Sequence, residues 1–168
     1  MKKIGLFYSK DTVKTSQIAK KILVEFEENE IEQVPLEDAR GKDFERFDNL
    51  IFGTSTWFDG ELPNAWDELL PEIETLTLSN KKIAIYGLGD QRNYPENFVD
   101  GIGLLAHIFE KLGAEIIGFT SIERYQFEKS AAVRGDQFCG LAVDFENQNK
   151  LTTQRVKDWS KQLKEEFY

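Results

Sequence analysis

Apolar residues along this chain occur in blocks that follow two different periods. Short apolar runs, such as residues 4–8 and 49–53, have the length and composition of strands that are buried on both faces. Longer segments, such as residues 96–112, repeat apolar residues every three or four positions, as amphipathic helices do. Strands that alternate with helices predict a parallel sheet with helices on both of its faces.

The pattern predicts five strands. They are residues 4–8, 31–36, 49–53, 82–87, and a last strand in two pieces, 115–119 and 138–143. A polar, aromatic segment, residues 120–137, interrupts this last strand. In the second strand, Pro35 donates no N–H, so this strand lies at an edge of the sheet or ends at Pro35. We therefore predict an α/β fold over residues 1–168 as one domain, with a doubly wound parallel sheet in the order 2-1-3-4-5.

Residues with known positional preferences predict where several helices begin or end. Pro63 is expected to open one helix, and Gly113 is expected to end the helix over residues 96–112. Thr152 or Thr153 is expected to cap the last helix, and residues 43–46 are expected to form a polar turn.

Charge and composition argue against several classes of binding partner and of site. The 168 residues include 21 basic and 30 acidic side chains, a net charge of −9, which argues against nucleic acid and anionic membranes as partners. A single Cys139 and a single His107 are too few for a disulfide framework or a Cys/His metal site. The sequence has no apolar run near the ~20 residues of a membrane span, and its first apolar run is too short for a signal peptide. We therefore expect a cytoplasmic protein.

The loop after the first strand is rich in hydroxyl groups and leads into a helix. It contains Ser9, Thr12, Thr15 and Ser16. A helix start has about four unpaired N–H groups and the positive end of the helix dipole, so added hydroxyl groups make a site for a phosphate. The alternative is that Ser9, Thr12 or Thr15 only caps the helix, as Ser and Thr often do.

In a sheet of the predicted order, ligands bind beyond the carboxyl ends of the strands, where the order reverses. Three loops leave those ends, residues 9–15, 54–60 and 88–94, and the second and third carry Trp57 and Tyr94. An aromatic side chain is costly to leave in water, because each one can bury about 150–250 Å². Two of them beside a phosphate site indicate a planar ring stacked between them, unless both fold back onto the sheet.

Five motifs match one known family. They are residues 2–8 with the loop Thr12, Lys14 and Thr15; Ser55-Thr56-Trp57; residues 87–91 with Tyr94 and residues 97–98; residues 125–130; and residues 140–148. With these residues the chain resembles a flavodoxin of the long-chain type over essentially its whole length. The resemblance implies a low-potential one-electron carrier, not an enzyme, that shuttles electrons between redox proteins through non-covalently bound FMN.

The resemblance also implies where FMN would bind. Residues 9–15 would hold the phosphate, and Trp57 and Tyr94 would flank the isoalloxazine ring. Residues 58–60 would face the flavin N5 atom, Gly89 and Asp90 with Asn97 would hold the pyrimidine edge, and Glu146 would reach the ribityl hydroxyl groups. The implied cofactor-binding residues are Ser9, Lys10, Asp11, Thr12, Val13, Lys14, Thr15, Ser55, Thr56, Trp57, Phe58, Asp59, Gly60, Leu88, Gly89, Asp90, Tyr94, Asn97 and Glu146.

Two positions in the first loop depart from the family pattern. Val13 stands where the family usually has glycine. A β-branched residue cannot easily take a positive φ, so either Val13 is already helical, which we expect, or the loop is reshaped. Lys10 stands where a hydroxyl residue is common, and either screens the phosphate or lies in solvent. Lys14 is expected to be a solvated lysine of the first helical turn.

Acidic residues on and after the cofactor loops bear on the reduction potential of a bound flavin and on which redox proteins can dock. They are Asp59, Glu61, Asp67, Glu68 and Asp90. They either lower the reduction potential of a bound flavin or are only part of an acidic surface. The expected partners are redox proteins with basic docking faces, of the ferredoxin/flavodoxin-NADP reductase type or other low-potential acceptors. The chain itself is expected to be a monomer.

Two other functions fit the same topology. A receiver-type signalling domain needs an Asp at the end of the third strand, where this chain has Gly53-Thr54. An FMN-dependent quinone or NAD(P)H oxidoreductase needs a substrate pocket over the flavin ring, which Trp57 and Tyr94 are expected to cover.

Overall fold

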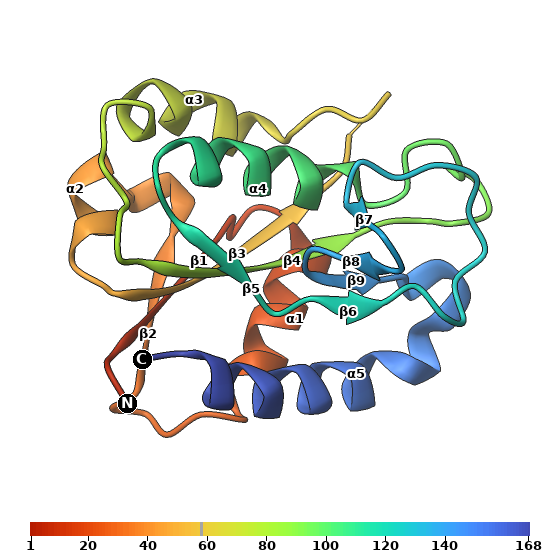
Figure 1. Cartoon of the computed structure of the whole chain (residues 1–168). Helices are drawn as coiled ribbons and strands as arrows, with labels where there is room; N and C mark the ends of the chain where they lie inside the picture. Colours follow the sequence, from red (N-terminus) through yellow and green to blue (C-terminus); the bar gives the residue numbers. More distant parts are fainter. Residues whose placement is uncertain (58) are drawn as a thin grey trace.

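The computed structural model describes residues 1–57 and 59–168, and its centre is a parallel sheet (Figure 1). The strands along the sheet, in spatial order, are β2 (Ile31–Pro35), β1 (Ile4–Tyr8), β3 (Asn49–Ser55), β4 (Lys82–Leu88) and β5 (Glu115–Ile117). A further short strand, β9 (Leu141–Val143), pairs with the end of β4, where β5 no longer reaches. The predicted order 2-1-3-4-5 and the split of the fifth strand are therefore confirmed.

Helices cover both faces of the sheet (Figure 1). On one face lie α2 (Gly41–Glu45), α3 (Asn64–Ile73) and α4 (Asp100–Lys111), and on the other lie α1 (Val13–Leu23) and α5 (Phe145–Glu166). Successive residues of a strand point to opposite faces, so Phe7 joins the core under α3 and α4 while Leu6 joins the core under α1 and α5. The apolar residues of strands β1 and β3 supply both cores, and this packing fixes the carboxyl ends of the two strands in place.

Three predicted boundaries were wrong. Residues 43–46 are mostly helical, as part of α2, because the ring of Phe44 stacks on Phe7 with the ring centroids 4.6 Å apart. Helix α4 begins at Asp100 and not near residue 96, since Val99 before it has a left-handed backbone with φ of +49°. Helix α5 begins at Phe145, well before Thr152, because the side chain of Asp144 accepts a hydrogen bond from the Asn147 N–H.

The segment that interrupts the fifth strand is folded and packs on α4. It contains a small antiparallel sheet of β6 (Thr120–Ser121), β8 (Gln137–Phe138) and β7 (Val133–Arg134). Its chain runs directly over Gly103 of α4, where an added Cβ atom would lie 2.1 Å from the carbonyl oxygen of Ala131. Only glycine allows the helix and the inserted segment to come this close.

Replacing Gly103 with alanine is expected to lower the free energy of unfolding by about 1–2 kcal/mol. The added methyl group overlaps the Ala131 carbonyl, and this overpacking outweighs the roughly 1 kcal/mol by which alanine favours a helix over glycine. Urea denaturation of the cofactor-free protein measures the change. Leu104→Ala, at the neighbouring exposed position, is the control and should cost less. An alanine variant at Gly103 as stable as the native chain would contradict the close packing.

Candidate functional site

The loops after β1, β3 and β4 meet at the carboxyl edge of the sheet, together with the first turn of α5. They enclose a cavity of about 430 Å³, lined by Thr12, Val13, Lys14, Thr15, Ser55, Thr56, Trp57, Leu88, Gly89, Asp90, Tyr94, Phe145 and Glu146. A second cavity of about 490 Å³ adjoins it, because the two share five lining residues, and adds Asp59, Asn97 and Phe98. Fourteen of the nineteen predicted cofactor-binding residues line one cavity or the other.

The start of α1 forms one end of the 430 Å³ cavity. Val13 is the first residue of the helix, so its backbone is helical, as expected. The first hydrogen bond of the helix runs from the Ser16 N–H to the Thr12 carbonyl oxygen at 3.0 Å, so the N–H groups before it lack helical partners. The Thr12 hydroxyl makes no capping bond and instead donates to the Ser9 carbonyl oxygen at 3.1 Å. The alternative that Thr12 only caps the helix is therefore wrong.

Two hydroxyl groups in the lining of this cavity are buried without a partner. Within residues 1–57 and 59–168, neither Thr15 Oγ1 nor Ser55 Oγ has a hydrogen-bond partner. A buried polar group that is left unpaired costs about 1–3 kcal/mol. A ligand with hydrogen-bonding oxygen atoms in this cavity would provide the missing partners.

Trp57 and Tyr94 supply aromatic surface to both cavities. Trp57 is half-buried and is fixed by two backbone hydrogen bonds of 2.7 Å that it exchanges with Glu61. Tyr94 is 62% exposed, so the alternative that both rings fold back onto the sheet is wrong for Tyr94. The arrangement offers apolar surface for a planar ring beside a polar, hydroxyl-rich helix start.

The turn between Trp57 and Glu61 requires glycine at residue 60. Gly60 has φ of +92°, and a Cβ atom there would lie 2.7 Å from a carboxylate oxygen of Asp100 and 3.1 Å from Asn97 Nδ2. Asn97 thus lies beside Gly60. Phe58, which was also predicted to contribute to the site, lies outside the described residues.

The Asp90 carboxylate shapes the loop after β4. It accepts hydrogen bonds from the Arg92 N–H at 3.1 Å, from the Asn93 N–H at 3.0 Å and from Asn147 Nδ2 at 2.8 Å. Partial burial raises the pKa of Asp90, but these hydrogen bonds outweigh it and hold the pKa below its ordinary value. Asp90 therefore contributes a negative charge at the cavity wall, and its side chain is already occupied by its own loop and by α5.

Four of the predicted residues that the structure describes line neither cavity, namely Gly60 in the turn above and Ser9, Lys10 and Asp11 in the first loop. The Lys10 ammonium group pairs with Asp38 at 3.1 Å on the surface, instead of turning toward the cavity. The Ser9 hydroxyl donates to the carboxylate of Glu37. Of the predicted phosphate loop, the structure thus brings only Thr12–Thr15 to the cavity.

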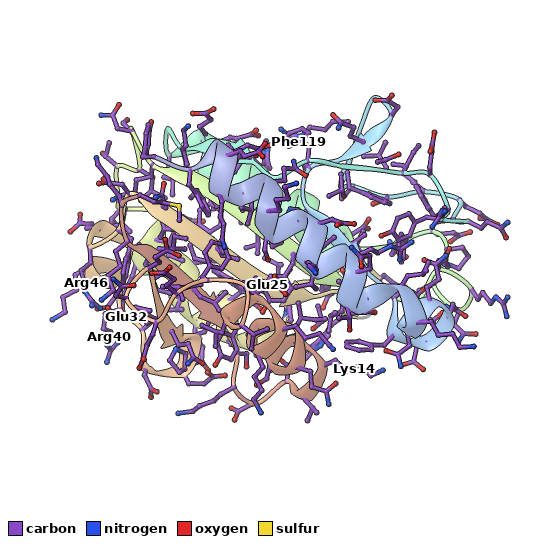
Figure 2. All side chains as sticks on the ribbon, turned by 90° about the horizontal axis from the view of Figure 1, so that it is seen from below. Lys14, Glu25, Glu32, Arg40, Arg46 and Phe119 are labelled. Atoms are coloured by element: carbon purple, nitrogen blue, oxygen red, sulfur yellow. The ribbon has the colours of Figure 1, made fainter. Side chains whose placement is uncertain are left out.

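Lys14 and Glu146 form an ion pair that joins the first turns of α1 and α5, and both line the 430 Å³ cavity. Figure 2 shows Lys14 at the start of α1, beside the beginning of α5. Lys14 is an exposed lysine of the first helical turn, as predicted, and the ion pair with Glu146 was not predicted. Phe145, which also lines the cavity, was missed because the last helix was predicted to begin later in the chain.

Two further observations concern other kinds of site. In the described part of the chain, no group of three or more His, Cys, Asp or Glu side chains is placed to hold a metal ion. Across the same residues, no helix has both the length and the apolar character needed to cross a membrane.

Comparison with known proteins identifies the family to which this fold and cavity correspond. A family model described as Flavodoxin matches residues 6–159. The chain belongs to the flavodoxin family. Membership of this family disfavours both the receiver-domain alternative and the quinone-reductase alternative. The long-chain type stays a prediction.

Individual flavodoxins match along their full length. The flavodoxin of Synechococcus elongatus is 41% identical over 168 residues, which cover 99% of each chain. Flavodoxin 1 of Escherichia coli is 36% identical over 165 residues, covering 98% of this chain and 94% of its own. Among solved structures, the Fusobacterium nucleatum flavodoxin bound to flavin mononucleotide has a TM-score of 0.94, with 35% identity and complete coverage of both chains.

Proposed function

We propose that this chain is a low-potential one-electron carrier that binds FMN non-covalently at the carboxyl edge of its sheet. Membership of the flavodoxin family supports the proposal, as does the flavin mononucleotide named for the Fusobacterium nucleatum structure. The observation that carries it for this chain is the pair of buried hydroxyl groups of Thr15 and Ser55, without partners among the described residues, in a cavity that Trp57 and Tyr94 also line.

The residues present fit the two ends of FMN. The N–H groups at the start of α1 and the hydroxyl group of Thr15 would hold the phosphate, while the Thr12 hydroxyl stays bonded to the Ser9 carbonyl oxygen. Trp57 and Tyr94 would stack on the isoalloxazine ring, with Gly89 and Asn97 near its polar edge. Glu146 would face the ribityl chain, and residues 1–168 would act as one FMN-binding domain.

When bound, FMN supplies the one-electron chemistry, and the protein sets its potential. Asp59 and Asp90 line the two cavities, so additional negative charge on the flavin would be disfavoured, whereas the charge of Glu146 is offset by Lys14. A unit charge about 8 Å away contributes roughly 2 kcal/mol at an effective dielectric constant near 20, and less in salt. These carboxylates would therefore lower the reduction potential, while the two aromatic side chains exclude water from the ring.

The acidic surface supports redox proteins with basic docking faces as partners, such as reductases of the ferredoxin/flavodoxin-NADP type. With a net charge of −9, long-range attraction would speed the encounter and would weaken as salt rises. We propose that the chain works as a cytoplasmic monomer, because electron carriers form small and short-lived interfaces.

Titration of the cofactor-free protein with FMN tests the proposal. We expect one FMN to bind per chain with a dissociation constant below about 1 μM, and to quench both the flavin and the tryptophan fluorescence. Riboflavin, which lacks the phosphate, should bind at least about tenfold more weakly, since hydrogen bonds to charged groups contribute about 1.5–3 kcal/mol each. Unchanged fluorescence of both partners at micromolar concentrations would refute the function.

A further inference from the structure

Glu37, in the short 3-10 helix η1 (Leu36–Asp38) after β2, is bonded to the loop that precedes α1. One oxygen of its carboxylate accepts the hydroxyl of Ser9, and the other accepts the Lys10 N–H at 3.1 Å. Partial burial raises the pKa of Glu37, but the hydrogen bonds from Ser9 and from the loop backbone outweigh it and hold the pKa below its ordinary value. Glu37 is therefore a charged acceptor fixed to this loop at neutral pH.

The contact continues through the loop to the helix start. Ser9 Oγ, which donates to Glu37, accepts the Asp11 N–H at 3.3 Å, and the Thr12 hydroxyl donates to the Ser9 carbonyl oxygen at 3.1 Å. Helix α1 begins at the next residue and has no side-chain cap of its own. The direction in which the chain enters α1 is thus set by the bonds that begin at Glu37.

Glu37 bonds the loop but does not line the cavity, so its role can be told apart from that of a residue that binds the ligand directly. Glu37, Ser9, Lys10 and Asp11 line neither cavity, whereas all of Thr12–Thr15 line the 430 Å³ cavity. A carboxylate near a phosphate site would, by charge alone, weaken the binding of an anion. The charge effect and the loop-holding effect of Glu37 therefore have opposite signs, so an experiment can distinguish them.

We propose that Glu37 is a positioning residue for the phosphate end of the flavin site. It holds residues 9–12 so that the N–H groups of Thr12–Thr15 and the hydroxyl group of Thr15 face the cavity. The inference rests on the proposed function, and it assigns to Ser9 and Lys10 a role in bracing the loop instead of direct contact with the cofactor.

The variant Glu37→Gln tests this role. Glutamine keeps the shape of the side chain but replaces one acceptor oxygen with an NH₂ donor, so one of the two bonds to the loop is lost. We expect its FMN dissociation constant to rise about three- to tenfold, while that of riboflavin changes less than about twofold. In the cofactor-free protein, the amides of residues 9–15 should exchange their hydrogens faster than in the native chain.

Asp38→Asn is the matched control. It removes the same charge from the adjacent residue, whose carboxylate bonds only the Lys10 side chain among the described residues. We expect unchanged or slightly tighter FMN binding and native exchange rates at residues 9–15.

Three results would overturn the role of Glu37. They are FMN binding by Glu37→Gln as tight as, or tighter than, that of the native chain; an equal loss of affinity for riboflavin; and native exchange rates at residues 9–15. A native protein that binds neither flavin would instead refute the proposed function, and the exchange rates would still decide whether Glu37 holds the loop.

Discussion

Replacing Asp144 with alanine is expected to lower the free energy of unfolding by about 3–4 kcal/mol. The side chain is fully buried, and it accepts hydrogen bonds from Gln91 Nε2 at 2.7 Å, from the Gln91 N–H at 3.1 Å and from the Asn147 N–H at 3.0 Å. Its removal leaves buried donors unpaired, at about 1–3 kcal/mol each, and removes the cap of α5, at about 1 kcal/mol. Urea denaturation of the cofactor-free protein, followed by circular dichroism, measures the loss.

Asp158→Ala serves as the control for this prediction. Asp158 lies on the same helix but is exposed, and its carboxylate accepts a bond from Gln154 on the preceding turn at 2.8 Å. Its removal should change stability by no more than about 0.5 kcal/mol. If Asp144→Ala lost less than about 1 kcal/mol, the network around Asp144 would not be what joins α5 to the loop after β4.

The strands of the sheet, and from their alternation with helices its order, could be predicted because the burial of each strand leaves a pattern in its own sequence. The runs in β1 and β3 are apolar at successive positions and are short, as is typical of a strand covered on both faces. Once the order of strands was known, the position of the ligand site followed from the place where that order reverses. Trp57 and Tyr94 stood out because both interrupt polar loops at that edge.

The helix starts were harder to predict, because they depend on contacts that are distant in sequence. Val99 takes a left-handed backbone although a β-branched residue disfavours it, and the chain around it is held by a bond from the Phe98 N–H to the Lys129 carbonyl oxygen at 3.3 Å. Phe44 is a lone apolar residue in a polar stretch, and its packing on Phe7, which is distant in sequence, holds the helix of that stretch against the core. Asp144 did carry a local signal, since Asp is a preferred helix cap. Thr152 and Thr153, which follow it, are equally acceptable as caps, so the local sequence did not distinguish between them.

The ion pairs and loop contacts of the site had no sequence signal at all. Lys14 and Glu146 are 132 positions apart, and Ser9 and Glu37 are 28 apart. No local period relates such residues, and charged side chains are common at exposed positions whether or not they pair. The residue types around the cavity were therefore predictable, whereas the division between residues that line it and residues that brace it was not.

Replacing Thr15 with valine is expected to weaken FMN binding about ten- to a hundredfold while making the cofactor-free protein more stable by up to about 1–2 kcal/mol. Valine keeps the shape of threonine but removes a buried hydroxyl that has no partner among the described residues, which relieves its cost in the empty site. The same hydroxyl is predicted to bond the phosphate, and a hydrogen bond to a charged group contributes about 1.5–3 kcal/mol. The Thr15 carbonyl oxygen accepts the Tyr86 hydroxyl at 3.0 Å and stays in place, so only the side-chain effect is measured.

The variant Ser160→Ala separates the expected effect on stability from the expected effect on FMN binding. The Ser160 hydroxyl is also buried without a partner in the described part of the chain, but it lies in α5 and is not part of either cavity lining. Its removal should stabilise the cofactor-free protein in the same direction and leave the FMN dissociation constant unchanged. Fluorescence titration with FMN and urea denaturation, applied to both variants, give an FMN dissociation constant and a free energy of unfolding for each.

Equal FMN affinities for Thr15→Val and Ser160→Ala would mean that the Thr15 hydroxyl does not bind the phosphate. Opposite effects on stability and binding at Thr15 alone would identify that hydroxyl as a group kept unpaired for the ligand.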